Sequence, residues 1–280
     1  MSGPSAGLAA TAGRAGVSAG TPGAASSYGT NRALALYARE TARSQSARLA
    51  LARRWGLSVP PLIAPAPPER RLAPSALHGI GPRSGLPPVI ARVPTRDRVV
   101  FLTIDDGAHK DPRLIRMVRE LSIPISAFLS DYVVRDDYDY FRQLQGLGVA
   151  INNHTINHRD LLTLSYRGQR KEICRQQDII EREFGVRPRI FRPPYGNWDR
   201  DTLRAARSCG VTVVPLWSQE AFARRIDFGG GEHRFQPGDI VLTHFRGRSE
   251  WDGTMPDMVR RVIRAATSQG FALARLEDYV

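Results

Sequence analysis

Hydrophobic and polar residues follow a block pattern from about residue 96 to residue 280. Short runs rich in β-branched and aromatic residues predict strands at 98–104, 124–129, 148–152, 189–192, 211–216, 239–244 and 271–276. Between them, apolar residues recur at helical spacing near 112–121, 137–146, 165–184, 199–208 and 255–269. This alternation predicts an α/β fold with parallel strands and helices packed outside, as in a small, incomplete β/α barrel. An open doubly wound sheet is the alternative, although no glycine-rich phosphate loop favours it.

Residues 1–95 differ from the rest of the chain in composition and in the structure they predict. Residues 1–30 are rich in Gly, Ala and Ser and are expected to be disordered. Residues 31–57 predict a basic, partly amphipathic helix that docks on its own domain, lies on an anionic surface or stands as a stub, and we favour docking. The prolines of residues 58–95 predict an extended linker without regular structure. We therefore divide the chain into a leader (1–57), this linker and a catalytic domain (96–280).

The net charge of +13 is concentrated in the leader and linker. Residues 1–96 hold twelve arginines against two acidic residues, whereas the remainder holds 28 basic and 25 acidic residues. A basic arm attracts nucleic acid or an anionic surface, but no nucleic-acid-binding motif accompanies it. We interpret the excess as arginine-rich composition and expect no specific nucleic-acid partner.

Two sequence signals bear on the compartment of the protein. No apolar run approaches the roughly 20 residues that span a bilayer, and the start of the chain lacks a signal-peptide pattern. Cys174 and Cys209 have no CxxC spacing, so buried free thiols are expected, with a disulfide between two helices as the alternative.

Polar clusters follow several of the predicted strands, where a β/α barrel collects its chemistry. These clusters are Asp105-Asp106, Asn152-Asn153-His154, Arg192-Pro193-Pro194-Tyr195 and His244. Neighbouring side chains at a strand end point to opposite sides, so one acid can bind a metal while the other accepts a proton. An Asp-Asp-Gly turn without chemistry is the alternative.

His154 and His158 are four residues apart in the sequence. On a helical turn this spacing places both imidazoles on one face, close enough to share one metal ion. Two histidines and a carboxylate form a common catalytic metal set, and Asp106 is the natural third ligand. A purely structural histidine pair is the alternative.

Four motifs together resemble those of a known family. Thr103-Ile104-Asp105-Asp106-Gly107, His154-Thr155-Ile156-Asn157-His158, Arg192-Pro193-Pro194-Tyr195 and Leu242-Thr243-His244 are similar, in order and spacing, to motifs of the polysaccharide deacetylases, carbohydrate esterases with a NodB homology domain. The resemblance covers roughly residues 97–280. It implies a deformed (β/α)7-type barrel that binds one divalent metal ion, zinc first, with cobalt or nickel as alternatives.

The resemblance also implies roles for individual residues. Asp106, His154 and His158 are the expected metal ligands, and Asp105 is the expected base. His244 is the expected acid toward the leaving group. In addition, Arg192 is expected to orient Asp105, while the backbone N–H of Tyr195 stabilises the oxyanion and Leu242 lies with Tyr195 at the substrate.

The chain departs from the family pattern at the motif that usually orients the catalytic histidine. No clear aspartate motif is present there, and Glu220 or Asp227 is the possible substitute. A histidine without a carboxylate partner is a weaker acid–base group, because its tautomer and orientation are less fixed.

The resulting hypothesis is a metal-dependent hydrolase that removes N-acetyl groups from an amino-sugar polysaccharide similar to peptidoglycan or chitin. The alternatives are a catalytically degenerate glycan-binding domain and a hydrolase of O-acetyl esters or cyclic amides on the same scaffold. We expect a monomer whose partner is its polysaccharide. The resemblance favours an extracytoplasmic or cell-wall location, although the sequence has no visible export signal.

Overall fold

The computed structural model describes residues 24–72 and 85–280, and the chain divides into units 1–47 and 48–280. Helix α1 (Ala24–Arg54) provides the described part of the first unit, where residues 33–47 are exposed. The expected disorder of residues 1–30 lies outside the described residues up to residue 23. From Ala24 the chain is helical, so the helix begins earlier than the sequence predicted.

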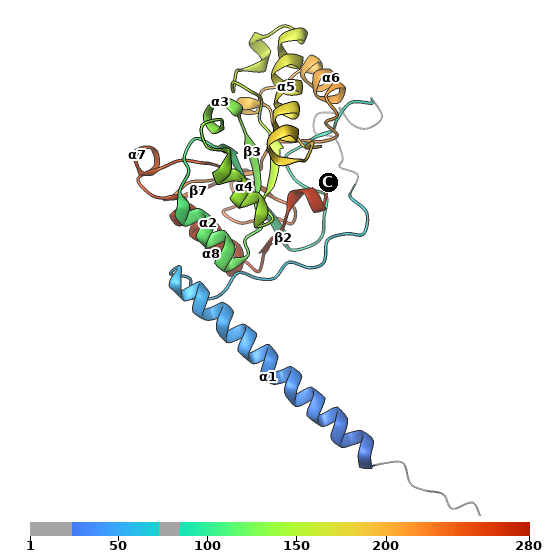
Figure 1. Ribbon diagram of the computed structural model, residues 1–280, viewed down its shortest axis with the longest axis vertical. Helices are drawn as coiled ribbons and strands as arrows, with labels where there is room; N and C mark the ends of the chain where they lie inside the picture. Colours follow the sequence, from blue (N-terminus) through green and yellow to red (C-terminus); the bar gives the residue numbers. More distant parts are fainter. Residues whose placement is uncertain (1–23, 73–84) are drawn as a thin grey trace, which may run out of the picture. The chain divides into compact units, whose positions relative to one another are not determined.

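A seven-stranded sheet forms the centre of the second unit (Figure 1). Its order is β4-β3-β2-β8-β6-β7, with β9 paired to β2, and β6–β7 is its antiparallel pair. The strands are β2 (Val99–Asp106), β3 (Ser126–Leu129), β4 (Ala150–Asn153), β6 (Gln219–Ala221), β7 (Ile226–Phe228), β8 (Ile240–His244) and β9 (Ala272–Leu273). A parallel pair, β1 (Val89–Ile90) with β5 (Val214–Pro215), forms a second small sheet.

Isolated bridges continue the curvature between the two sheets. Asn153 at the end of β4 pairs with Phe191, and the neighbouring Ile190 pairs with Val213 just before β5. The chain then runs from β5 into β6, which pairs with β8. The result is the deformed barrel that the sequence predicted.

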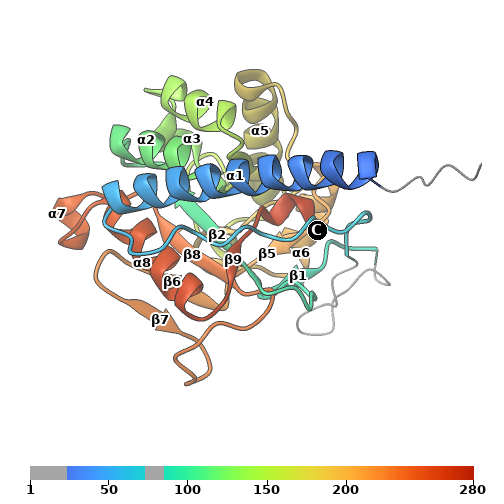
Figure 2. The same ribbon diagram turned by 90° about the horizontal axis from the view of Figure 1, so that it is seen from below.

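Helices surround this barrel (Figures 1 and 2). Within the second unit they are α2 (Pro112–Leu121), α3 (Asp131–Val134), α4 (Tyr138–Gly146), α5 (Tyr166–Phe184), α6 (Arg200–Ser208), α7 (Arg248–Trp251) and α8 (Met255–Ser268). Helix α2 packs beside α8, and α5 packs beside α6. No described helix has both the length and the apolarity needed to cross a bilayer.

Strand β2 is buried along its whole length, as expected for a parallel strand covered on both faces. Its even-numbered apolar residues, including Leu102 and Ile104, pack in the cluster that contains residues of α2, α4 and α8. Its Phe101 packs in a different cluster with Phe128 and Tyr279. This alternation places Thr103 and Asp105 on the same side of the strand as Phe101.

Two segments outside the predicted domain also pack in this unit. Ala52 and Leu57, near the end of the predicted helix, are buried, and Trp55 Nε1 donates a hydrogen bond of 2.8 Å to Glu120. The proline-rich segment contains β1, although the sequence predicted no regular structure there. The neighbouring prolines precede β1, so the backbone of Val89 and Ile90 can pair with β5. The prediction of a linker without regular structure was therefore wrong at residues 89–90.

The expectation of free thiols was also wrong. Cys174 on α5 and Cys209 directly after α6 form a disulfide with an S–S distance of 2.06 Å. The side-by-side packing of α5 and α6 brings together two cysteines 35 residues apart, and no local sequence signal reveals such a contact.

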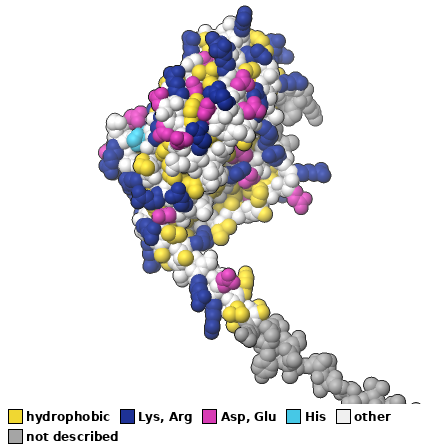
Figure 3. Space-filling view, viewed as in Figure 1, with side chains coloured by type: hydrophobic (Ala, Val, Ile, Leu, Met, Phe, Trp, Pro, Cys, Tyr) yellow, Lys and Arg dark blue, Asp and Glu magenta, His cyan; other side chains and the backbone are white. Residues whose placement is uncertain are grey.

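The surface of the described residues carries charges of both signs. Figure 3 shows Lys and Arg side chains spread over the visible face, with Asp and Glu side chains between them. Many surface arginines form ion pairs, such as Arg187 with Asp178 and Glu181. Such exposed pairs contribute little to stability.

Candidate metal centre

A hollow of about 300 Å³ lies at the carboxyl ends of β2 and β8. Its lining comes from five separate stretches of the chain: Asp105, Asp106, His154, His158, Pro193, Tyr195, Gly196, Trp217, Glu220, Leu242, His244 and Arg246. We call it the acidic hollow. It brings together all but two of the ten predicted site residues, Arg192 and Asp227.

Asp105 and Asp106 both face this hollow, whereas strand alternation predicted opposite directions. The difference arises because Asp106 leaves extended geometry, with φ of 75°. Gly107 follows with φ of 94°, and a Cβ there would lie 2.3 Å from Val134. The turn therefore needs glycine, and it swings the second carboxylate toward the first.

Asp105 is buried and held by a buried arginine. Arg192 Nη1 donates to Asp105 Oδ1 at 2.7 Å and to Thr103 Oγ1 at 2.9 Å. The remaining guanidinium nitrogens donate to the carbonyls of Pro215 and Leu216. Burial raises the pKa of Asp105, while the Arg192 guanidinium opposes that shift. Arg192 thus fixes the orientation of Asp105 and favours its charged form.

His154 is buried and oriented by a backbone contact. Its Nδ1 lies 2.7 Å from the carbonyl oxygen of Arg192, so that nitrogen carries the proton and donates. Burial lowers the pKa of His154 to about 3, so the ring is neutral near pH 7. Its Nε2 therefore presents a lone pair to the hollow.

His158 approaches His154 through a loop, not through the helical turn that the sequence predicted. Thr155 and His158 have φ values of 70° and 52°. Glu172 on α5 accepts hydrogen bonds from the backbone N–H (3.0 Å) and side-chain amide (2.8 Å) of Asn157. This carboxylate fixes the loop, and the two imidazole centroids lie 4.8 Å apart.

Three candidate ligand atoms meet at one point of the acidic hollow. Asp106 Oδ1 lies 3.3 Å from His158 Nε2 and 3.6 Å from His154 Nε2. This oxygen is buried and has no hydrogen-bond partner among the described residues. A neutral imidazole lone pair beside a carboxylate oxygen is unfavourable unless a cation lies between them. The three ligand atoms lie within 4.8 Å of one another and fit a divalent metal ion with open positions for water.

Tyr195 and Leu242 take up different positions at the hollow. Tyr195 has φ of 61° and is 62 % exposed, with its ring centroid 4.8 Å from that of His158. Its backbone N–H is not used in the hydrogen bonds of the turn, which are formed by Gly196 and Asn197. Leu242 is buried in β8 and contributes an apolar wall.

The two candidate partners of His244 differ in position. His244 ends β8 in register with Asp105 of β2. Glu220 lies on the neighbouring strand β6 and lines the same hollow, and burial raises its pKa while the nearby His244 opposes that shift. Asp227 is exposed and pairs with Arg225 at 2.9 Å. Within the described residues, His244 forms no hydrogen bond to either carboxylate.

Two residues that the sequence did not predict contribute to the site, one by direct contact and one by supporting a loop. Arg246, two residues after His244, donates from Nη2 to Asp106 Oδ2 at 2.8 Å. It leaves Oδ1 as the free oxygen of that carboxylate. Glu172, which supports the His158 loop, was the second. The position of Glu172 on a predicted helix gave no sign of a role at the site. Arg246 could have been found, because it lies two residues after the fourth motif.

Comparisons with known proteins identify chains that are similar to this one. A family model described as polysaccharide deacetylase matches residues 92–214. An uncharacterised protein of Streptomyces coelicolor is 40% identical over 196 residues, covering 70% of this chain and 78% of that protein. A chitooligosaccharide deacetylase of Azorhizobium caulinodans is 29% identical over 210 residues, covering 66% of this chain and 96% of the relative.

Solved structures share the fold at low sequence identity. A CE4 family pseudoenzyme from Bacillus anthracis superimposes with a TM-score of 0.58 at 19% identity, covering 69% of this chain and 68% of the other. At this identity the likeness supports the architecture alone.

Proposed function

The chain belongs to the polysaccharide deacetylase family, and from this premise we propose that it is a metal-dependent hydrolase. Its substrate in this proposal is an amino-sugar polysaccharide similar to peptidoglycan or chitin, and the bond cleaved is that of an N-acetyl group. The relatives named as chitooligosaccharide deacetylases support this substrate class.

One observation carries the proposal. Asp106 Oδ1 is buried without a hydrogen-bond partner among the described residues, and the Nε2 atoms of His154 and His158 lie within 3.6 Å of it. A structural cluster would pair these atoms with donors, whereas a metal site leaves them free. The proposed ligands are therefore Asp106, His154 and His158.

A divalent metal bound there would make water acidic enough to attack a carbonyl near neutral pH and would polarise the acetamide oxygen. In this proposal Asp105 accepts the proton of the attacking water. Arg192 holds one oxygen of its carboxylate, Oδ1, at 2.7 Å. The other oxygen, Oδ2, lies 3.6 Å from His154 Nε2, beside the proposed metal ligands, and is suited to accept the proton.

Two further groups complete the proposed reaction. The backbone N–H of Tyr195 donates a hydrogen bond to the oxygen that becomes negative in the tetrahedral intermediate. His244 protonates the leaving nitrogen, because that nitrogen leaves readily only as the protonated, neutral amine. Glu220 is the proposed carboxylate beside His244, since it lines the acidic hollow and Asp227 does not.

We also propose that the protein works outside the cytoplasm. The Cys174–Cys209 disulfide supports this location, because disulfides persist in oxidising compartments. A relative named as a peptidoglycan-N-acetylglucosamine deacetylase has a substrate that fits the same location.

The proposal is tested by acetate release from a panel of N- and O-acetylated glycans, with metal content measured on the same sample. Replacing Asp105→Asn is expected to lower acetate release by about 100- to 10,000-fold, the usual contribution of a general base, while metal content stays unchanged. Unchanged acetate release from D105N would contradict the assignment. Acetate release from O-acetylated substrates alone would show that the bond cleaved is an ester and not an amide.

The second candidate function is glycan binding without turnover. It is favoured by the absence, within the described residues, of a hydrogen bond that orients His244. A protein that binds acetylated glycans but releases no acetate after addition of zinc, cobalt or nickel would establish this alternative.

A further inference from the structure

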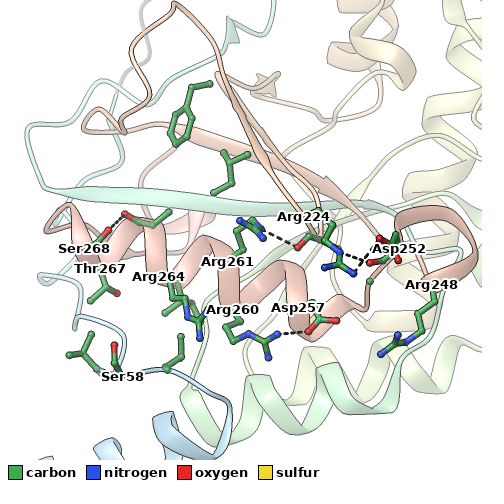
Figure 4. Close-up of a pocket in the computed structure, with 18 residues that line it drawn as sticks. Ser58, Arg224, Arg248, Asp252, Asp257, Arg260, Arg261, Arg264, Thr267 and Ser268 are labelled. Atoms are coloured by element: carbon green, nitrogen blue, oxygen red, sulfur yellow. Dashed lines mark hydrogen bonds and ion pairs between the residues drawn. The ribbon is translucent and has the colours of Figure 1, made fainter.

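A second hollow, of about 810 Å³, lies along α8 (Figure 4). Four stretches line it, residues 57–59, 223–228, 248–253 and 257–268, and none of its lining residues belongs to the acidic hollow. Five of the lining residues are arginines, so we call it the arginine hollow: Arg224, Arg248, Arg260, Arg261 and Arg264.

The charges of the arginine hollow do not balance. It contains two carboxylates, and each is already paired: Asp252 with Arg224 at 3.2 Å and Asp257 with Arg260 at 2.5 Å. Three guanidinium groups then have no carboxylate partner among the described residues, which leaves a net charge of +3: Arg248, Arg261 and Arg264. Positive charges gathered in a hollow raise the local concentration of anions.

Neutral backbone groups position two of these arginines. Arg261 Nε donates to the carbonyl of Ala223 at 3.0 Å, and Arg264 Nη2 donates to the carbonyl of Gly56. Figure 4 shows Arg261 extending toward the Arg224 segment, whereas Arg260 and Arg264 extend from the opposite side of α8. These contacts orient the guanidiniums without neutralising them. Each retains N–H groups for the bidentate geometry that suits a carboxylate or phosphate.

Apolar side chains complete the lining and narrow the class of ligand. Ile226, Phe228 and Ile263 contribute apolar surface between the arginines. Phe228 is the aromatic residue among the described lining residues, and its ring packs edge-on against Phe235 at 5.2 Å. A nucleic-acid site typically offers open aromatic faces for base stacking. A sugar ring instead presents apolar C–H faces between spaced polar groups. The apolar residues between the arginines of this lining match that pattern.

We propose that the arginine hollow binds a carboxylate-bearing segment of a polysaccharide. The arginines on the two sides of α8 contact successive acidic groups, and the apolar residues contact the ring faces between them. The identification of the polymer as a polysaccharide rests on the proposed function, whereas the preference for an acidic polymer rests on the charges of the hollow. The acidic hollow then acts on a glycan that is held at a second point.

The test uses the full chain and polygalacturonate oligomers, with binding measured by isothermal titration calorimetry. The matched ligand control is the same polymer with its carboxyl groups methyl-esterified. We expect binding of the acid form that weakens with added salt, and no binding of the ester. The triple variant R248Q/R261Q/R264Q is expected to bind about tenfold or more weakly, because each exposed ion pair contributes modestly.

A matched variant separates this site from general positive charge. R167Q/R175Q/R200Q removes the same charge from exposed positions on α5 and α6 and is expected to bind as the native chain does. Thermal melts confirm that both variants are folded. Equal losses in the two triple variants, or no binding of polygalacturonate, would overturn the proposal. Tighter binding to phosphatidylglycerol vesicles, lost in the same triple variant, would replace the polysaccharide with a membrane surface and also overturn it.

Acetate release from a neutral N-acetylated chitooligosaccharide, measured on the same variants, separates the two proposals. Binding of polygalacturonate without acetate release would contradict the proposed hydrolase alone. Acetate release without polygalacturonate binding would contradict the arginine hollow alone.

Discussion

The acidic hollow and the arginine hollow are built in opposite ways. Asp105, Asp106 and His154 are each about 2 % exposed. Asp105 is held by the buried Arg192, His154 by a backbone carbonyl, and Asp106 by the half-buried Arg246. The arginine hollow uses side chains at or near the surface, and carbonyl groups hold two of them. Burial therefore fixes the geometry of one region, while the other keeps side-chain freedom.

The two regions also present opposite atoms. Lone pairs meet at the acidic hollow, where Asp106 Oδ1 has no described donor, and N–H groups meet at the arginine hollow. A cation suits the first and anions suit the second. Because salt screens exposed charges more than buried ones, ligand binding at the two hollows is expected to differ in salt dependence.

The largest expected effect is a loss of stability, and it compares replacement of a buried arginine with replacement of a half-buried one. Arg192→Met leaves Asp105 buried without its ion-pair partner, so we expect the free energy of unfolding to fall by about 3–5 kcal/mol. Urea unfolding measures this change. The control Arg261→Met, in the arginine hollow, is expected to cost less than about 1 kcal/mol. Similar losses in both variants would contradict the contrast in burial.

The next effect concerns the arginine that contacts a proposed metal ligand. Arg246→Gln removes a positive charge 2.8 Å from Asp106 Oδ2, so zinc is expected to bind about tenfold more tightly. Titration against a competing chelator measures the dissociation constant, and Arg248→Gln, which removes a charge from the arginine hollow, serves as the control. Weaker zinc binding by R246Q would instead indicate that Arg246 chiefly orients Asp106.

The smallest effect concerns the start of the helix that carries the arginine hollow. Asp257 accepts hydrogen bonds from the hydroxyl and backbone N–H of Thr254 and pairs with Arg260. Although burial opposes the shift, these contacts lower the pKa of Asp257 below its usual value of 3.8. Its charged form therefore stabilises the fold above that pH, and this contribution is lost as pH falls through the lowered pKa.

Asp257→Asn is accordingly expected to reduce the free energy of unfolding by about 0.5–1 kcal/mol at pH 7. The difference from the native chain should shrink as the pH falls below about 4. Unfolding curves at pH 7 and pH 3 measure both values, with Asp252→Asn as the more exposed control. A difference that grows at low pH would contradict the direction of the shift.

Much of the barrel could be predicted because its periodicity is local. Every predicted strand contains observed backbone pairing, including residues 189–192, where the pairing is limited to isolated bridges. Every predicted helix after residue 96 is present. The missed elements are short or lie beside prolines, such as β1 and α7, where few residues provide a pattern.

The candidate site was predictable in its members and not in its geometry. The residues of the four motifs can be recognised in the sequence, because carboxylates and imidazoles follow predicted strands. The convergence of Asp105 and Asp106 depends on the left-handed conformation of Asp106, and the position of His158 depends on Glu172 of the helix that follows its loop. Neither follows from strand or helix periodicity.

The sequence by itself determined the alternation of strands and helices, the polar residues at the strand ends and the family. These features are encoded by neighbouring residues, whose spacing matches the period of a strand or helix. Only the tertiary structure decided which carboxylate oxygen remains unpaired, which arginine contacts it, that two cysteines 35 residues apart form a disulfide, and that arginines from separate segments share a hollow. Such contacts join residues far apart along the chain, and their energies depend on packing and burial that no local pattern specifies.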